Sequence, residues 1–374
     1  MIVVLFFPLI LILLVTLFNA LTAPQVGTGP EPRAKVKVSI LIPARNEEIN
    51  LDRCLAGLCA QDYPDLEILV LDDGSTDTTA KIIESWARRD PRVRGLRGEP
   101  VPPEWTGKNW ACQQLSSRAS GGVLIFTDAD NRHAPKAVAR TVGWMQKLGL
   151  GLFSAFPQQE TVTLGEKLVV PVFDLFVYSL LPLWLTYASK YPSLSAANGQ
   201  WLAVTRPTYE ALGGHRAVRG QVVEDVELAR RAKRLKVRIL TASGGDHVRG
   251  RMYRSWAGVW SGFSKNAFGL MSFKTVPFFI LLVFLFAAFV LPYGLVFHGA
   301  TALPAAAAIL MTVTLRLILV LKFRQPPLVS TLLNPVSIGA TLLVGINSYI
   351  CWRRGYIIWK GRKVALKSTG KGKK

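Results

Sequence analysis

In the stretch LIFTDAD, residues 124–130, an apolar run ends in two aspartates one residue apart. The run is typical of a buried strand. Two carboxylates that converge at a strand end repel each other unless a cation neutralises them. Asp128 and Asp130 therefore predict a site for Mg²⁺ or Mn²⁺, completed by substrate phosphates. The alternative for an isolated pair is a solvated turn or a helix cap.

Strands and helices alternate around this stretch. Apolar runs predict strands at residues 36–42, 66–71 and 123–127, and a further strand is predicted at 92–97. Amphipathic stretches predict helices at 47–60, 78–89 and 109–119. Such alternation indicates a parallel sheet with helices on both faces. In sheets of this kind the ligand lies beyond the carboxyl ends of the strands. The loops that follow the strands, at 43–47, 72–75 and 128–130, are therefore the expected site.

Two of these loops carry further candidate residues. In LDDGSTD (71–77), Gly74, Ser75 and Asp77 suit a turn and a helix cap, but such a turn does not need both Asp72 and Asp73. One of these two aspartates suits a donor group on a nucleobase or a ribose. In PARNEE (43–48), the alternatives are simple capping and an arginine that meets an anionic or planar group.

Two helix starts add a cation and a pair of acids. In WTGKNW (105–110), Gly107 and Lys108 open a helix whose amides favour a phosphate, although the spacing is not that of a P-loop. Glu224 and Asp225 begin the helical stretch 222–235. Stabilisation by the helix dipole explains such acids. The functional alternative is a general base that deprotonates an acceptor hydroxyl.

Long apolar stretches indicate a membrane protein. Residues 1–21 predict a retained anchor, with a cleaved signal peptide as the alternative, and residues 275–297, 301–321 and 328–350 predict later spans. The last of these contains Asn334-Pro335, and a re-entrant or interfacial segment is its alternative. Residues 168–187, interrupted by prolines, predict an interfacial helix.

The formal net charge of +21 fits membrane lipids better than nucleic acid, for which no binding motif is present. The positive-inside tendency places the middle domain in the cytoplasm of a multi-pass protein of the cell membrane. With three late spans the basic tail, 351–374, lies outside, against that tendency. RGRMYRSW (249–256) is either a headgroup-binding segment or a diphosphate clamp. The four cysteines have neither zinc nor disulfide spacing.

Taken in order, these motifs resemble the family 2 glycosyltransferases with a GT-A fold. The resemblance covers about residues 36–270. GKNWACQQ (107–114), FSKN (263–266) and WKGR (359–362) are similar to membrane-bound transferases of the carotenoid and hopanoid type. The remaining stretches that carry it are PARNE, DDGSTD, WTGKNWA, TDAD, AANGQ (196–200), GGH (213–215), VVEDVELARR and RMYRSW.

The resemblance implies a nucleotide-diphospho-sugar transferase domain at 36–270, with a transmembrane anchor at 1–22 and membrane segments at 275–350. It implies a UDP-sugar donor, a lipid acceptor and transfer with inversion. Asp225 matches the catalytic base, with Glu224 beside it, and Asp128 and Asp130 match the metal- and diphosphate-binding pair. Positions that match donor-binding residues are Pro43, Ala44, Arg45, Glu47, Asp72 or Asp73, Lys108, Asn198 and Gly199.

One departure from the family pattern bears on the product. Processive members carry Q-x-x-R-W, whereas here Arg251 stands in the glutamine position and Trp256 lies one place late after Arg254. This favours transfer of a single sugar, expected to be glucose, and it puts Arg251, Arg254 and Trp256 in doubt as donor-binding residues. A polyprenyl phosphate or a sphingolipid-like lipid is the alternative acceptor. A non-catalytic nucleotide-binding scaffold is the alternative from another class of protein.

Overall fold

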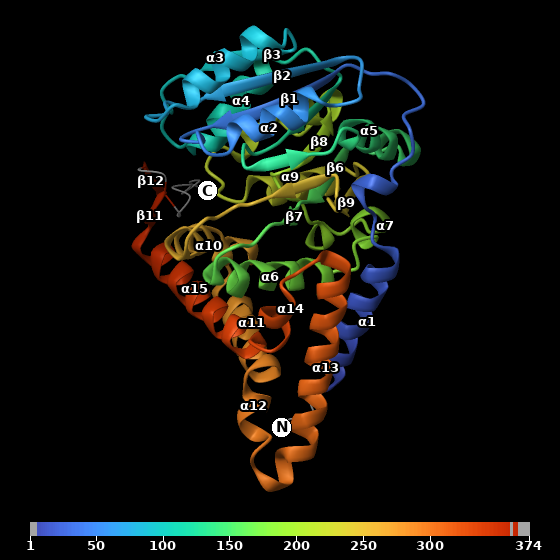
Figure 1. Ribbon diagram of the computed structural model, residues 1–374, viewed down its shortest axis with the longest axis vertical. Coiled ribbons are helices and arrows are strands. Elements are labelled where there is room, and N and C mark those ends of the chain that lie inside the picture. The colour runs from blue at the N-terminus through green and yellow to red at the C-terminus, as the bar shows by residue number, and fades with distance from the viewer. Residues whose placement is uncertain (1–5, 360–361, 366–374) are drawn as a thin grey trace, which may run out of the picture. The chain divides into compact units, whose positions relative to one another are not determined.

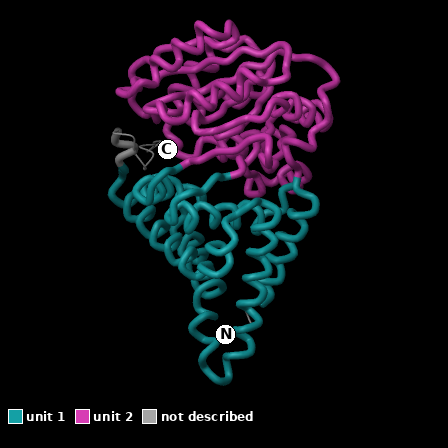
Figure 2. Tube along the Cα trace, viewed as in Figure 1, with its two compact units in different colours: residues 1–23, 159–183, 253–359 teal, residues 24–158, 184–252, 360–374 magenta. Residues whose placement is uncertain are grey.

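The computed structural model describes residues 6–359 and 362–365, and the chain forms two compact units (Figure 2). The sheet unit comprises residues 24–158, 184–252 and 360–374, and the helical unit comprises residues 1–23, 159–183 and 253–359. The predicted domain 36–270 therefore includes two segments, 159–183 and 253–270, that belong to the helical unit. Each unit is described by itself.

The sheet unit is built on a seven-stranded sheet in the order β3-β2-β1-β4-β8-β6-β9 (Figure 1). The neighbours among the first four strands are parallel, as predicted, and so are β6 and β9. The prediction of a wholly parallel sheet is wrong at β8, which is antiparallel to both β4 and β6. The strands are β1 (Val38–Ala44), β2 (Leu66–Asp72), β3 (Val93–Arg97), β4 (Val123–Phe126), β6 (Leu152–Phe156), β8 (Leu202–Thr205) and β9 (Ile239–Ser243).

The reversed direction of β8 decides where the site forms. Phe126, the last residue of β4, pairs with Leu202, the first residue of β8. The residues just before β8 therefore lie at the edge where β4 ends. Strand β6 ends at the same edge, because β8 is antiparallel to it as well. The chain passes from β6 to β8 through residues 157–201.

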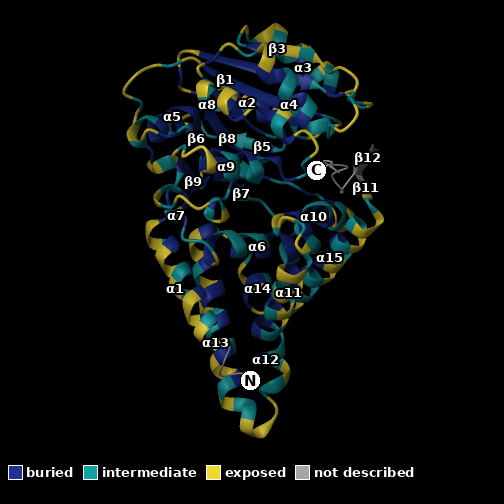
Figure 3. Cartoon of the chain, turned by 180° about the vertical axis from the view of Figure 1, so that it is seen from behind, coloured by how far each residue is buried: buried dark blue, intermediate teal, exposed yellow. Residues whose placement is uncertain are grey.

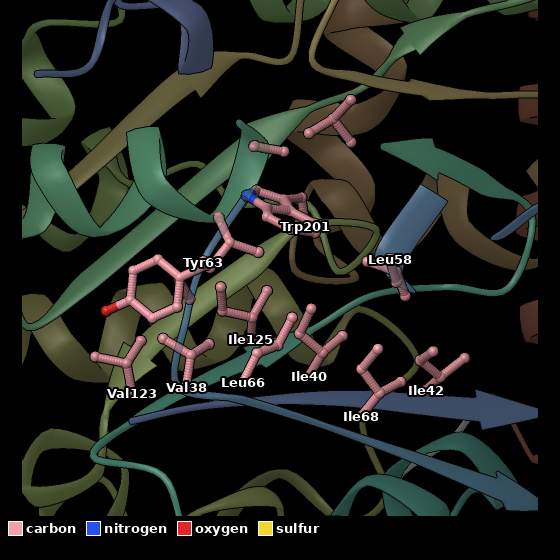
Figure 4. Close-up of a cluster of buried hydrophobic side chains, with 14 of the residues drawn as sticks. Val38, Ile40, Ile42, Leu58, Tyr63, Leu66, Ile68, Val123, Ile125 and Trp201 are labelled. Carbon is pink, nitrogen blue, oxygen red and sulfur yellow. The ribbon is translucent and has the colours of Figure 1, made fainter. Parts of the chain in front are cut away.

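Helices cover both faces of the sheet, as predicted. A hydrophobic core lies on each face of the sheet. Successive residues of a strand belong to the two cores in turn, because successive side chains point to opposite faces. Ile40, Ile68 and Ile125 pack with α2 and α5, as Figure 4 shows for the strand residues, whereas Leu41, Leu69 and Leu124 pack with α4 and α9. The helices are α2 (Leu51–Cys59), α3 (Thr79–Arg89), α4 (Gly107–Arg118), α5 (Ala137–Leu148), α7 (Leu185–Ala188), α8 (Arg206–Ala211) and α9 (Glu224–Arg234).

Two predicted boundaries of the sheet unit are wrong. The strand predicted at 36–42 is β1, and it extends through Pro43 and Ala44, which pair with Leu71 and Asp72. Pro43 lies beyond Leu41, where the pairing of β1 with β4 ends, so its missing N–H breaks no rung of that pair. The helix predicted from residue 47 begins only at Leu51, since Glu47 and Asn50 form a turn before it. Short elements complete the unit: η2 (Val26–Thr28), η3 (Pro192–Leu194), η4 (His215–Val218), β5 (Asn131–His133) and β10 (Val248–Gly250).

Among its described residues, the helical unit contains three helical stretches that are long and apolar enough to cross a membrane: Thr275–Leu295, Gly299–Phe323 and Asn334–Arg354. Figure 3 shows many exposed residues along them. Helix α1, at Phe6–Thr22, is apolar but only 17 described residues long. The helices of this unit are α1, α6 (Leu164–Ser179), α10 (Trp256–Leu270), α11 (Thr275–Phe289), α12 (Leu291–Leu295), α13 (Gly299–Phe323), α14 (Pro327–Thr331) and α15 (Asn334–Arg354).

The helical unit refines two predictions. The segment predicted at 328–350 is interrupted after α14, because Pro335 at the start of α15 opens a helix and cannot continue one. The helix predicted within 168–187 is α6, which begins earlier at a capping box of Thr163 and Glu166. Buried Asn19 of α1 holds the end of α6 by donating to the carbonyls of Tyr178 and Leu181. The interfacial position of α6 stays a prediction.

The remaining strands are β7 (Gln158–Gln159), β11 (Tyr356–Trp359) and β12 (Arg362–Ala365). Of the basic tail predicted at 351–374, residues 360–361 and 366–374 lie outside the described residues, and so does part of WKGR (359–362).

Candidate active site

The strand ends of the sheet unit bring the predicted acids together. Asp128 and Asp130 follow β4, Gly199 precedes β8, and Glu224 and Asp225 form the first turn of α9. Gly199 lies at the centre of this group. A Cβ atom built on it would lie 3.1 Å from Lys108 Nζ, 3.3 Å from Glu224 Oε1 and 3.5 Å from Asp225 Oδ2. Lys108, Glu224 and Asp225, which are far apart from Gly199 in the sequence, thus lie close to it, and their role as a site stays a prediction.

Lys108 links two of the acids. Its Nζ atom lies 2.9 Å from Asp128 Oδ1 and 3.2 Å from Glu224 Oε1. Burial lowers the pKa of Lys108, but the two carboxylates outweigh it and raise that pKa above the usual value. The side chain remains charged at neutral pH. Because its side chain is 38% exposed, the ammonium group is accessible to an anionic ligand.

Asp225 is held at both oxygens by the backbone. Oδ2 accepts a hydrogen bond from Gly199 N–H at 2.7 Å, and Oδ1 accepts one from Val226 N–H at 2.8 Å. Burial and the Glu224 carboxylate raise the pKa of Asp225 to about 7, although Lys108 and both N–H groups act in the opposite direction. A carboxylate with such a pKa is a suitable general base at neutral pH.

Asp128 and Asp130 fit a divalent cation as part of a larger ligand set. Within residues 6–359 and 362–365 no three His, Cys, Asp or Glu side chains lie close enough to hold a metal alone. Two carboxylates are nevertheless a sufficient protein contribution for Mg²⁺ when substrate phosphates complete the coordination. Carboxylate oxygens are also the donors that Mg²⁺ and Mn²⁺ prefer. The residues present therefore fit a cation that binds together with a diphosphate.

The loops after β1 and β2 support each other. Arg45 donates to the carbonyls of Asp73 and Gly74, at 2.5 Å and 2.9 Å. Asp72 closes the turn, because its Oδ1 accepts from Ser75 N–H at 2.9 Å. The buried Asp73 donates its N–H to the carbonyl of Ala44. Arg45 and Asp72 therefore have structural partners, and their contact with a nucleotide stays a prediction.

Local contacts or positions describe other residues of the predicted set. Glu47 Oε2 accepts a hydrogen bond from Asn50 at 2.8 Å, while Glu47 N–H donates to Thr79 Oγ1. Thr106 caps α4, which places Lys108 in the first turn of that helix, as expected from GKNW. Pro43 and Ala44 lie at the edge where β1 ends.

The three candidate residues of the RMYRSW stretch belong to different units of the chain. Arg251 N–H donates to the carbonyl of Asp130 at 3.4 Å, so Arg251 belongs to the site edge of the sheet unit. Arg254 and Trp256 belong to the helical unit, where Trp256 opens α10 behind the Ser255 cap. Their assignment as donor-binding residues stays a prediction.

Gln200 and Asn131 are polar residues of this site that the sequence analysis did not single out. Gln200 Nε2 donates to Asp130 Oδ1 at 3.2 Å, and the side chain of Asn131 contacts the same amide at 3.3 Å. Both residues are buried. The available signal was their position, directly after the predicted Gly199 and the predicted Asp130.

Comparison with solved structures identifies the fold. A mannosyltransferase from Pyrobaculum calidifontis, solved in complex with GDP-Man and Mn²⁺, superimposes with a TM-score of 0.60 at 19% identity. The match covers 93% of this chain and 95% of that one. The fold is therefore the GT-A fold of nucleotide-sugar transferases, with additional apolar helices.

Sequence comparison finds similarity to known glycosyltransferases. Residues 39–168 match the model of glycosyl transferase family 2. The 4,4'-diaponeurosporenoate glycosyltransferase of Staphylococcus haemolyticus is 28% identical over 228 residues, 58% of this chain and 57% of the relative. The enzyme of the same name from Staphylococcus aureus strain USA300 is 27% identical over 224 residues, 58% of this chain and 56% of the relative. The chain thus matches little more than half the length of these relatives.

Proposed function

We propose that the protein is an inverting glycosyltransferase that moves a single glucose from UDP-glucose to a lipid-soluble acceptor. The observation that carries this proposal is the arrangement of Asp225, Lys108 and Asp128 at the strand ends. Asp225 has a pKa of about 7, and the cationic Lys108 lies between Asp128 and Glu224. Glycosyl transfer from a nucleotide donor requires a base close to a group that binds the diphosphate.

Asp225 removes the proton of the acceptor. A hydroxyl group needs a base at the moment its oxygen attacks the anomeric carbon. A carboxylic acid that arrives through apolar surroundings also retains its proton, because desolvation raises its pKa. Asp225 serves either acceptor, and attack opposite the leaving group inverts the anomeric centre.

The donor end of the site binds the diphosphate. Lys108 offers an ammonium group to the phosphates, and the turn that carries Asp72 and Asp73 faces the nucleoside. Asp128 and Asp130 would hold Mg²⁺ or Mn²⁺. When bound, the cation neutralises the charge that develops on the leaving UDP.

The names of the curated relatives favour a carotenoid acid as the acceptor. The three helical stretches long enough to cross a membrane support an acceptor that dissolves in the bilayer. Together with the formal charge of +21, they also support a multi-pass location in the cell membrane with the sheet unit in the cytoplasm.

The acceptor class is tested with membranes that contain the protein. They are incubated with radiolabelled UDP-glucose, UDP-N-acetylglucosamine or GDP-mannose, and the organic extract is analysed by mass spectrometry. We expect label from UDP-glucose in one carotenoid-sized lipid. Membranes with Asp225→Asn are the matched control and give no labelled lipid. Label in a polyprenyl phosphate, recognised by its acid lability, or in a polymer would contradict the proposal.

A further inference from the structure

Gln200 is fixed by the segment that follows β4. Its backbone carbonyl accepts hydrogen bonds from Thr127 Oγ1 at 2.8 Å and from Asn131 Nδ2 at 2.6 Å. All three residues are almost completely buried, with exposed fractions of 0% for Thr127, 1% for Asn131 and 3% for Gln200. The loop before β8 is therefore tied to the loop that carries the two metal-binding candidates.

These contacts determine which way both side-chain amides face. A carbonyl only accepts, so the nitrogen of the Asn131 amide must face Gln200 O. The Asn131 oxygen then lies 3.3 Å from Gln200 Nε2, and this contact requires the Gln200 amide to present its NH₂ group. The same NH₂ group donates to Asp130 Oδ1 at 3.2 Å. Asp130 therefore meets a donor whose orientation is set by its surroundings.

The residue before Gln200 contacts the other acid. Gly199 N–H donates to Asp225 Oδ2 at 2.7 Å. Asn198 anchors the loop, because its N–H donates to Ser154 Oγ at 2.8 Å and its carbonyl accepts from Ser154 Oγ at 3.1 Å. Gly199 and Gln200, which are consecutive residues of one short loop, thus donate hydrogen bonds to Asp225 and Asp130 respectively.

We propose that Gln200 is a positioning residue, which orients the Asp130 carboxylate for a divalent cation while Gly199 in the same loop holds Asp225. The loop 198–200 thereby fixes the cation-binding acid and the base relative to each other. The inference rests on the proposed function, in which Asp130 holds the cation and Asp225 is the base. Partners that orient a metal ligand typically change metal affinity by about 10- to 100-fold when they are removed.

The test measures Mn²⁺ binding rather than turnover. Full-length protein in detergent is titrated with Mn²⁺ in the presence of UDP, and bound Mn²⁺ is followed by electron paramagnetic resonance. Gln200→Met keeps the side-chain length and removes the donor. Gln200→Asn keeps an amide that is one methylene too short to reach Asp130. Ser154→Ala is the matched control, since it loosens the same loop without touching either acid.

We expect both Gln200 variants to weaken Mn²⁺ binding about 10- to 100-fold, with unfolding temperatures close to that of Ser154→Ala. Ser154→Ala is expected to bind Mn²⁺ as the wild type does. Wild-type affinity in a folded Gln200→Met or Gln200→Asn protein would overturn the inference alone. An equal loss in Ser154→Ala would also overturn it, because loop stability would then explain the effect. A wild-type protein that binds no Mn²⁺ with UDP would contradict the proposed function itself.

Discussion

The pKa of Asp225 makes the pH dependence of transfer a direct test of its role as the base. A base acts only when it is ionised, so activity is lost as the pH falls through the pKa of about 7. One unit below that pKa only about a tenth of the molecules carry the ionised group. The rate at pH 6 is therefore expected to be about tenfold below the alkaline plateau.

Two substitutions shift this profile in opposite directions. Glu224→Gln removes a negative charge that raises the pKa of Asp225, and it also releases Lys108 from its ion pair. Both effects favour ionised Asp225, so the acid limb moves to lower pH. Lys108→Met removes the cation that lowers the pKa of Asp225, so the limb moves to higher pH. Glu227→Gln, in the same helical turn, is the control, because Glu227 pairs with Arg230 and Arg234.

The assay follows kcat/KM for transfer to a hydroxyl-bearing carotenoid from about pH 5 to pH 9, which reports ionisations of the free enzyme. The opposite shifts of Glu224→Gln and Lys108→Met, with no shift in Glu227→Gln, are the expected result. A wild-type profile that is flat between about pH 6 and pH 8 would refute the reasoning, and so would a shift of both variants in the same direction.

Three further predictions test other parts of the site. Asp128→Asn and Asp130→Asn should each reduce the binding of UDP in the presence of Mn²⁺, measured by calorimetry, while UDP binding in excess EDTA should be weak and equal in all three proteins. Gly199→Ala should lower kcat by about tenfold or more at unchanged unfolding temperature. The reason is that the added Cβ would lie 3.1 Å from Lys108 Nζ, so the neighbouring side chains must move by a few tenths of an ångström. A kcat equal to that of the wild type would contradict this prediction. Asn109→Ala should lower the free energy of unfolding by about 2 kcal/mol, because the buried Asn109 amide donates to the carbonyls of Val218, Arg219 and Gln221; unchanged denaturant unfolding would exclude that role.

Much of the fold follows from local sequence patterns. Apolar runs of strand length identify β1, β2 and β4, since these strands are buried on both faces and contain few polar residues. The direction of β8 could not be predicted, because the four residues LAVT carry no signal of strand orientation. That direction is defined by the pairing of β8 with β4 and β6, which are distant in the sequence and become neighbours of β8 only in the folded sheet.

The candidate site could likewise be predicted from the sequence only in part. Asp128, Lys108 and Asp225 could be predicted because each follows a strand or opens a helix, where a parallel sheet collects its ligands. The contacts of Gln200 with Asn131 and Asp130 were not predicted, because they depend on how the residues before β8 meet the end of β4. The hydrogen bond by which Asp72 closes its turn was not predicted either, because the sequence does not show which aspartate of the pair Asp72-Asp73 accepts it.

We propose above that the strand-end acids of this chain catalyse transfer of a sugar to a lipid, with Asp225 as the base. The most direct measurement compares the wild type with Asp225→Asn for the rate at which labelled glucose passes from UDP-glucose into a purified carotenoid acceptor, both proteins first being shown to bind UDP equally. The account predicts transfer by the wild type and a loss of about 10²- to 10⁴-fold in Asp225→Asn. Equal rates in the two proteins would contradict it.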